Sequence, residues 1–220
     1  MAAPNTITIH NLNGTWVMDK SISNDPDGIF KLQGMSWLTR KAIGLATVTL
    51  KIKQTKNAQG ADELAIDQLL TGGVKGTSEH RVLDWSERDH ADHIFGDVVG
   101  QSRFLKAGAA SEGSGGKRLP EVDVQTKTGD ADKDVAVAKF LRGEILANDD
   151  LTEGFVVDGE NEDFMQSWVR SKGDGWTAEQ IWGFEMVDGV RRYTRRIVVA
   201  KGEEIEKVRL VYTFVSDSTE

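Results

Sequence analysis

The chain has 220 residues, a formal net charge of −8 and no cysteine. Its length is sufficient for one domain with a sizeable core, while the lack of cysteine excludes disulfides, thiolate catalysis and zinc–cysteine sites. The negative charge, which no dense Lys/Arg cluster reverses locally, excludes nucleic acid as an expected partner.

The first residues, Met1 to Thr6, lack the apolar segment of a secretion signal. No window approaches the roughly 20 apolar residues that span a bilayer. We therefore expect a cytoplasmic protein without stable membrane insertion. The sequence leaves the oligomeric state open.

A strand followed by two short helices is predicted at the start of the chain. Residues 7–18 alternate as a strand does, and Asn24-Asp25-Pro26 favours a helix over 24–33, because a side-chain oxygen can cap the free amides while Pro26 needs no N–H in the first turn. Ser36 can cap a second helix, over 36–43. Helices this short do not persist alone in water, so we expect them to cover the mouth of a barrel. The side chains expected to face inward from the second helix are Trp37, Leu38 and Ile43.

From residue 46 onward the period becomes two, which predicts a series of strands. Asp188-Gly189 between alternating runs is a strong hairpin signal, and residues 87–90 have the composition of a turn. Residues 106–118, rich in Ala, Gly and Ser, indicate a flexible surface loop. Residues 121–151 are ambiguous, with room for one or two strands and the short run Val135 to Ile145. The predicted strands are 47–54, 63–70, 79–85, 93–105, 163–170, 176–187, 190–200 and 204–215.

These elements predict one all-β domain over residues 1–220. We expect a closed antiparallel meander barrel of about nine or ten strands, whose last strand pairs with the first so that no long edge is exposed. A helix-turn-helix lid is expected at about 24–43 and an insertion at about 106–162.

The segment from Gly14-Thr15-Trp16 to Lys41, including Gly34, Trp37 and Arg40, resembles the opening of the fatty-acid-binding-protein branch of the calycin superfamily. Gly-x-Trp is also the lipocalin signature. The resemblance covers residues 10–55 well and 163–216 by pattern, and it finds no counterpart for 106–162.

The resemblance implies a hydrophobic small molecule held inside the barrel. Many such proteins are carriers, and some lipocalin-like barrels of natural-product pathways are cofactor-free cyclases, including Diels-Alderases. The family's last strand carries an Arg-x-Tyr pair for the ligand carboxylate. Here one extra residue separates Arg209 from Tyr212. Alternation therefore puts the two side chains on opposite faces, so they do not match the family's Arg-x-Tyr pair.

Alternation predicts which side chains line the cavity. The apolar sets of the last strands are assigned to the interior, which leaves Glu179, Glu185 and Arg209 outside. An apolar concavity with a few polar groups is typical of small-molecule sites, although the same side chains could simply fill a core. The candidate catalytic residues are Arg195, Tyr193 and Tyr212, and the candidate ligand-binding residues are Trp168, Gln180, Trp182, Phe184, Met186, Leu210, Phe214 and Trp37.

Other chemistry receives little support from the sequence. Trp16 is expected to pack at the closed end of the barrel, where Arg209 could cover it through a cation–π contact. We expect neither a metal nor another cofactor, because a solvated turn explains the polar residues that could form a metal site. Those residues are His80, Asp89, His90, Asp92 and His93.

Two functions remain after these exclusions, and the enzyme is preferred. The first is cofactor-free cyclisation or isomerisation of a polyketide or terpenoid precursor, in the manner of a Diels-Alderase, because positioning the two ends of one substrate needs no nucleophile. The alternative is a non-catalytic carrier of fatty acid or another lipophilic metabolite. A barrel filled by its own side chains is a third possibility.

Overall fold

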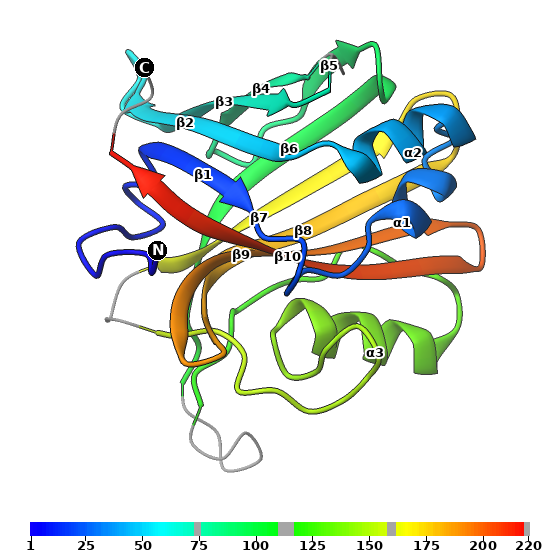
Figure 1. Cartoon of the computed structure of the whole chain (residues 1–220). Coiled ribbons are helices and arrows are strands. Elements are labelled where there is room, and N and C mark those ends of the chain that lie inside the picture. The colour runs from blue at the N-terminus through cyan, green and yellow to red at the C-terminus, as the bar shows by residue number, and fades with distance from the viewer. Residues whose placement is uncertain (73–75, 110–116, 158–161, 218–220) are drawn as a thin grey trace.

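The computed structural model describes residues 1–72, 76–109, 117–157 and 162–217, apart from the side chains of residues 92, 162 and 163. Ten antiparallel strands form one curled sheet in the order β4-β3-β2-β1-β10-β9-β8-β7-β6-β5 (Figure 1). The strands are β1 (Gly14–Met18), β2 (Val48–Lys56), β3 (Asp62–Leu70), β4 (Ser78–Val82), β5 (Arg88–Asp92), β6 (Gly96–Lys106), β7 (Glu162–Ser171), β8 (Trp176–Val187), β9 (Val190–Lys201) and β10 (Glu204–Ser216). The helices are α1 (Asp27–Leu32), α2 (Trp37–Leu45) and α3 (Ala131–Leu141).

The last strand pairs with the first, as the sequence predicts. Trp16 lies opposite Phe214 and Met18 lies opposite Tyr212, so the chain's beginning and end are joined in one ladder. The two edge strands of the sheet are β4 and β5, and within the described residues no ladder joins them. The barrel is therefore closed by hydrogen-bonded strands everywhere except at this boundary.

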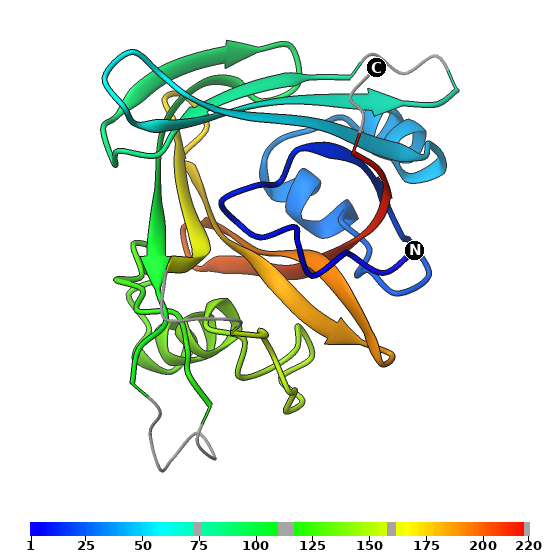
Figure 2. The same cartoon turned by 90° about the vertical axis from the view of Figure 1, so that its left-hand side faces the viewer.

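The two ends of the barrel are covered by different segments. The lid helices α1 and α2 lie at one end, and the N-terminal segment crosses the other (Figure 2). Ala3, Ile7, Ile9 and Leu12 of that segment are buried in the barrel core. The predicted strand over 7–18 is thus too long, because residues 7–12 cover the barrel end and only Gly14–Met18 pairs.

The second lid helix is capped by Ser36 as predicted, but the first is not capped by Asn24. The Ser36 hydroxyl accepts from the Thr39 amide at 3.2 Å. The Asn24 side chain instead accepts from the Arg209 amide of β10 at 2.8 Å, so it fixes the lid to the sheet. Ile43 is buried as expected, but Trp37 is 63% exposed and Leu38 72% exposed, which corrects the face predicted for α2.

The insertion packs against the outer face of the sheet. Its Val137, Phe140 and Leu141, spaced as on one helix face, form a second core with Ile181 of β8 and Val198 of β9. Figure 1 shows α3 outside the barrel beside these strands. The first part of the ambiguous run Val135 to Ile145 thus belongs to a helix that ends at Leu141. Asp130 caps its start and accepts from the amides of Asp132 and Lys133. The predicted flexible loop at 106–118 lies largely outside the described residues.

The predicted turn at 87–90 is wrong, because Arg88–Asp92 forms the edge strand β5 and pairs with β6. The Asp188-Gly189 hairpin joins β8 to β9 as predicted, with positive φ angles of 51° and 72°. No helix in the described part of the chain has the length and apolar character needed to cross a bilayer.

Candidate functional site

A cavity of about 310 Å³ lies inside the barrel. Its apolar lining comes from α1 and from strands on opposite sides of the barrel, and includes Phe30, Val98, Trp176, Ile197 and Leu210. Polar side chains make up the rest of the lining and include Gln68, Glu79, Arg81, Ser102, Gln180, Arg195 and Tyr212. An apolar wall with placed polar groups is typical of small-molecule sites.

The predicted alternation of β8, β9 and β10 agrees with the structure. Trp182, Tyr193 and Tyr212 belong to the barrel core. Gln180, Arg195, Leu210 and Tyr212 line the cavity itself. These strands are long and paired over almost their whole length, so the register that sets each side chain's face is firmly determined.

Arg195 is a buried cation held among aromatic rings. Its guanidinium carbon lies 3.8 Å from the ring centroid of Trp182 and 5.5 Å from that of Tyr212. Its Nε donates to the Tyr193 hydroxyl at 3.0 Å. The residue is 4% exposed, and Nη2 is buried without a hydrogen-bond partner among the described residues. An unpaired buried donor is costly, so this one is free to bind a polar group of a ligand.

The tyrosines beside Arg195 remain neutral hydroxyls. Burial raises the pKa of Tyr193, although the Arg195 charge opposes the effect. Burial likewise raises the pKa of Tyr212, again against Arg195. Burial lowers the pKa of Arg195, but Tyr193, Tyr212 and Glu79 outweigh it and hold that pKa above its usual range. The site thus presents a permanent cation and hydroxyl groups that keep their protons.

A second polar group in the cavity, the pair Glu79 and Arg81 on β4, was missed by the sequence analysis. Arg81 donates to Glu79 Oε2 from Nη2 at 2.5 Å and from Nε at 2.8 Å. Burial opposes ionisation of Glu79, but Arg81 and Arg195 outweigh it and lower its pKa. The available signal was the alternation of Glu79, Arg81 and Leu83, which places the first two on one face.

A second chamber of about 490 Å³ adjoins the first beneath the lid helices. Both chambers are lined by Phe30, Gln68, Phe95, Leu210 and Tyr212. Because these residues lie between the chambers, a long ligand held at Arg195 can extend past Phe30 toward α2.

Six of the predicted ligand-binding side chains do not line the cavity: Trp182 packs against the Arg195 guanidinium, and the other five lie elsewhere. Phe184 and Phe214 pack on Trp16 at the end covered by the N-terminal segment, with ring centroids 6.4 and 5.0 Å away. Trp168 has the parity of Phe164 and Gln166, which face the insertion, so it lies on the outer face. Met186, near the end of β8, is 42% exposed, and Trp37 of the lid projects into solvent.

Trp16 packs as predicted, but Arg209 does not cover it. Trp16 is fully buried and donates from its indole to the Leu12 carbonyl at 3.0 Å. Arg209 lies on the outer face of β10, where Nη1 donates to Glu185 Oε2 at 3.2 Å. The cation–π contact expected between them is therefore absent.

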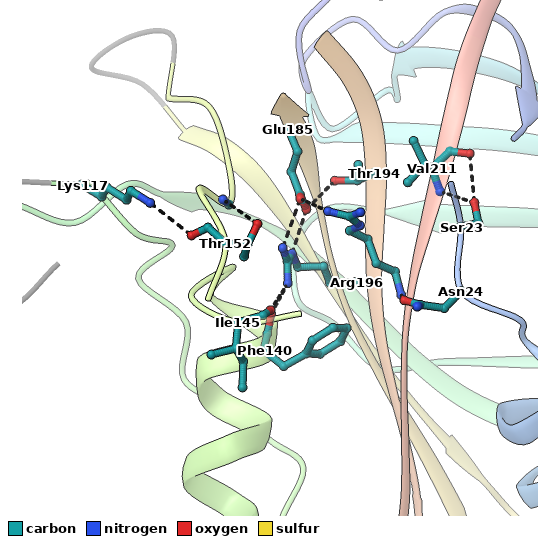
Figure 3. A network of polar contacts seen from close by, with 12 residues as sticks. Ser23, Asn24, Lys117, Phe140, Ile145, Thr152, Glu185, Thr194, Arg196 and Val211 are labelled. Carbon is teal, nitrogen blue, oxygen red and sulfur yellow. Dashed lines mark hydrogen bonds and ion pairs between the residues drawn. The ribbon is translucent and has the colours of Figure 1, made fainter. Parts of the chain in front are cut away.

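Glu185 and Arg196 form a buried ion pair under the insertion (Figure 3). Arg196 donates to Glu185 at 2.7 and 3.1 Å, and to the carbonyls of Phe140 and Ile145 at 3.1 and 2.6 Å. Glu185 also accepts from Thr194 at 3.0 Å. Glu179, six residues earlier on β8, is also buried and accepts from the Gln125 and Thr126 amides. The prediction that both glutamates lie outside the barrel is right, but the insertion shields both from solvent.

Comparison with a solved structure identifies the architecture. Fatty-acid-binding protein 1 of Echinococcus granulosus superposes with a TM-score of 0.51 at 14% identity, over 93% of this chain and 98% of that one. The fold is that of the fatty-acid-binding proteins. The likeness shows the fold and agrees with the all-β barrel predicted from the sequence.

Two curated proteins match almost the whole chain. The probable pericyclase scpY of Mollisia scopiformis is 26% identical over 215 residues, which are 97% of this chain and 95% of that protein. The pericyclase pydY of an Acremonium species is 26% identical over 216 residues, 98% of this chain and 97% of that protein. No protein-family model matches the chain.

Proposed function

We propose that this protein is a pericyclase that folds a hydrophobic, unsaturated polyketide or terpenoid precursor inside the barrel and cyclises it without a cofactor. The observation that carries the proposal is Arg195, a buried guanidinium on the cavity wall whose Nη2 lacks a partner among the described residues. The similarity to two pericyclases along nearly the full chain supports the same function.

Positioning supplies the first part of the catalysis. A pericyclic cyclisation converts π bonds into σ bonds within one molecule, so no atom is gained or lost and no nucleophile is required. Holding the two reacting ends in contact removes part of the entropic barrier that a freely rotating chain faces. The apolar walls of Trp176, Ile197 and Leu210 would favour a folded substrate over an extended one.

Hydrogen bonding supplies the second part. The Arg195 guanidinium and the Tyr212 hydroxyl would donate to a carbonyl conjugated with the reacting π system. Such bonds draw electron density toward the oxygen and strengthen as charge develops in the transition state. Tyr193 would act through Arg195, because its hydroxyl accepts a hydrogen bond from Arg195 Nε. Trp182 would support the same guanidinium from its ring face.

The test is turnover of a linear precursor. Native mass spectrometry after incubation with a lipid extract of the source organism identifies the bound molecule, and chromatography distinguishes a cyclic isomer of equal mass. We expect many turnovers for the natural chain, with kcat about 10²–10³-fold lower for Arg195→Met, by analogy with the loss of one transition-state donor. Tyr212→Phe should show a smaller loss.

A matched control separates chemistry from folding. Arg142→Gln removes a cation of the insertion, far from the cavity, whose ion pair with Glu144 is partly exposed. We expect its turnover to equal that of the natural chain. Release of an unchanged ligand in stoichiometric amount by the natural chain would overturn the enzyme proposal and indicate a carrier.

A further inference from the structure

The boundary between β4 and strands β5 and β6, which we call the seam, is joined within the described residues by scattered contacts, among them a weak hydrogen bond from Gln101 to the Trp85 carbonyl at 3.5 Å and the Arg103 guanidinium 4.1 Å from the Trp85 ring centroid. No ladder joins β4 to β5 in the described part of the chain. The Trp85 amide donates to the Ser102 carbonyl at 2.8 Å. From the inner side of β4, Arg81 Nη1 donates to Ser167 of β7 at 2.5 Å and more weakly to Ser102 at 3.5 Å.

The chamber that contains Arg195 extends to the seam. Its lining includes residues from both sides of this boundary, and several are exposed: the side chain of His80 is 60% exposed and that of Arg88 41%. The seam residues that line it are His80, Val82, Ser86, Arg88, Asp89, His90 and Gln101. The chamber therefore extends to partly exposed residues in the wall of the barrel.

The lid is held more firmly than the seam. Asn24 exchanges hydrogen bonds with Arg209, its amide donating at 3.0 Å and its side chain accepting at 2.8 Å, and Ser23 Oγ accepts from the Val211 amide at 2.9 Å (Figure 3). Ile29 and Leu32 of α1 are buried in the barrel core. Lifting the lid would expose these apolar side chains, whereas widening the seam breaks a few hydrogen bonds that water can replace.

The lid chamber offers a poorer route to Arg195. Phe30 and Phe95 line both chambers, so a molecule arriving beneath α2 passes these rings before it reaches the guanidinium. A molecule arriving at the seam meets the mostly polar side chains of this boundary and the Glu79–Arg81 pair before it reaches Arg195.

We infer that the substrate reaches the Arg195 chamber through the seam, and that Arg81, by bridging β4 to β7, controls the width of this opening. The inference rests on the proposed function, since it assigns the access route of the same cavity. A long substrate would pass its apolar end through the Arg195 chamber into the lid chamber, while its polar group remains at Arg195.

Cross-linking tests this route, and the lack of native cysteine makes it specific. Cysteines at Ser86 and Gln101, beside the Trp85–Ser102 hydrogen bond, are joined with dibromobimane to close the seam. For the lid control, cysteines replace Gly28 and Glu206, because a Cβ at Gly28 would lie 2.8 Å from the Glu206 carboxyl carbon. The probe is anilinonaphthalene sulfonate, followed by stopped-flow fluorescence.

We expect the seam cross-link to slow association and dissociation of the probe equally, by at least about tenfold, with no change in Kd. The lid cross-link should alter either rate by less than about twofold. Slowing by the lid cross-link alone, or unchanged rates in the seam cross-link, would overturn the route and leave the proposed function standing. Failure of the probe to bind the unlinked chain would overturn the route, whereas failure of the proposed function would appear separately as absent turnover of a linear precursor.

A substitution tests the role of Arg81 separately. Ser167→Ala removes the β7 acceptor and preserves the Glu79–Arg81 pair, so both probe rates should rise about threefold at constant Kd. Ser171→Ala, which alters the turn after the same strand, should leave both rates unchanged. Equal rates in the two variants would contradict the assigned role of Arg81.

Discussion

Two consecutive arginines on β9 have opposite surroundings. Arg196 faces outward and is satisfied by Glu185 and by two backbone carbonyls. Arg195 faces the cavity and retains an unpartnered Nη2 within the described structure. Because a strand directs successive side chains to opposite faces, the same stretch of backbone serves the core on one side and the site on the other.

The outer pair makes a prediction about stability. Glu185→Gln preserves the shape of the side chain but leaves Arg196 as an uncompensated buried cation. We expect the free energy of unfolding at pH 7 to fall by about 3–5 kcal/mol, measured by urea denaturation. Glu63→Gln, which alters a partly exposed pair with His80, should change it by less than about 1 kcal/mol. Equal losses would show that Glu185 is not a structural anchor.

The same pair predicts a pH dependence. Burial opposes ionisation of Glu185, but Arg196 and Arg209 outweigh it and hold its pKa below the ordinary 4.5. A depressed folded-state pKa contributes stability that is complete above the unfolded-state pKa and is lost as pH falls through the folded-state pKa. The stability difference between the natural chain and Glu185→Gln should therefore shrink below about pH 4.5 in urea titrations. A difference independent of pH would contradict this linkage.

Residue-level prediction succeeded where burial and alternation agree. Arg195, Tyr193 and Tyr212 could be placed in the barrel because each shares a face with apolar neighbours on a long strand. Glu79 and Arg81 were missed, because alternation puts them on one face of the short strand β4 but does not indicate strongly which face is buried. The burial of Glu185 could not be predicted, because the segment that covers it comes from another part of the sequence.

At the scale of elements, the insertion depends on a close backbone contact. Gly154 has a φ of +70°, and a Cβ there would lie 2.1 Å from the Gly143 carbonyl oxygen. Gly143 follows α3, so this contact fixes the segment after the helix against the helix end. A non-glycine residue at position 154 would meet both a steric and a conformational penalty.

Gly154→Ala should therefore lower the free energy of unfolding by about 1–3 kcal/mol, as measured by thermal or urea denaturation. Gly173→Ala is the control, because its added Cβ would meet no atom within 4 Å. A loss no greater than that of the control would show that the contact relaxes at no cost.

Elements with strong local signals were predicted and those without were not. The β8–β9 hairpin follows from Asp188-Gly189, and the second lid helix from Ser36. Helix α3 was missed because the short apolar run from Val135 suits a buried strand as well as a helix. Strand β5 was missed because an edge strand with polar residues on both faces lacks alternation.

At the scale of the whole molecule, the sheet separates two apolar cores. One fills part of the barrel, and the other joins α3 to the outer faces of β7, β8 and β9. Strands covered on both faces should open last, and the edges at the seam should open first.

Hydrogen exchange followed by mass spectrometry measures this order. We expect the slowest backbone amides in the β8–β9 hairpin, with β4 and β5 exchanging at least about 100-fold faster. Bound anilinonaphthalene sulfonate should slow amide exchange in the strands that line the Arg195 chamber and leave exchange in α3 unchanged. Equal protection of β5 and β8 would contradict the weak seam.

The second core also has a consequence for how this scaffold diversifies. Since the outer layer secures the central strands, replacements among the lumen residues can reshape selectivity at limited risk to folding. A library confined to cavity positions such as Gln180 and Leu210 should hence yield many soluble members with altered substrate preference. The insertion would then allow the cavity residues to change without loss of folding.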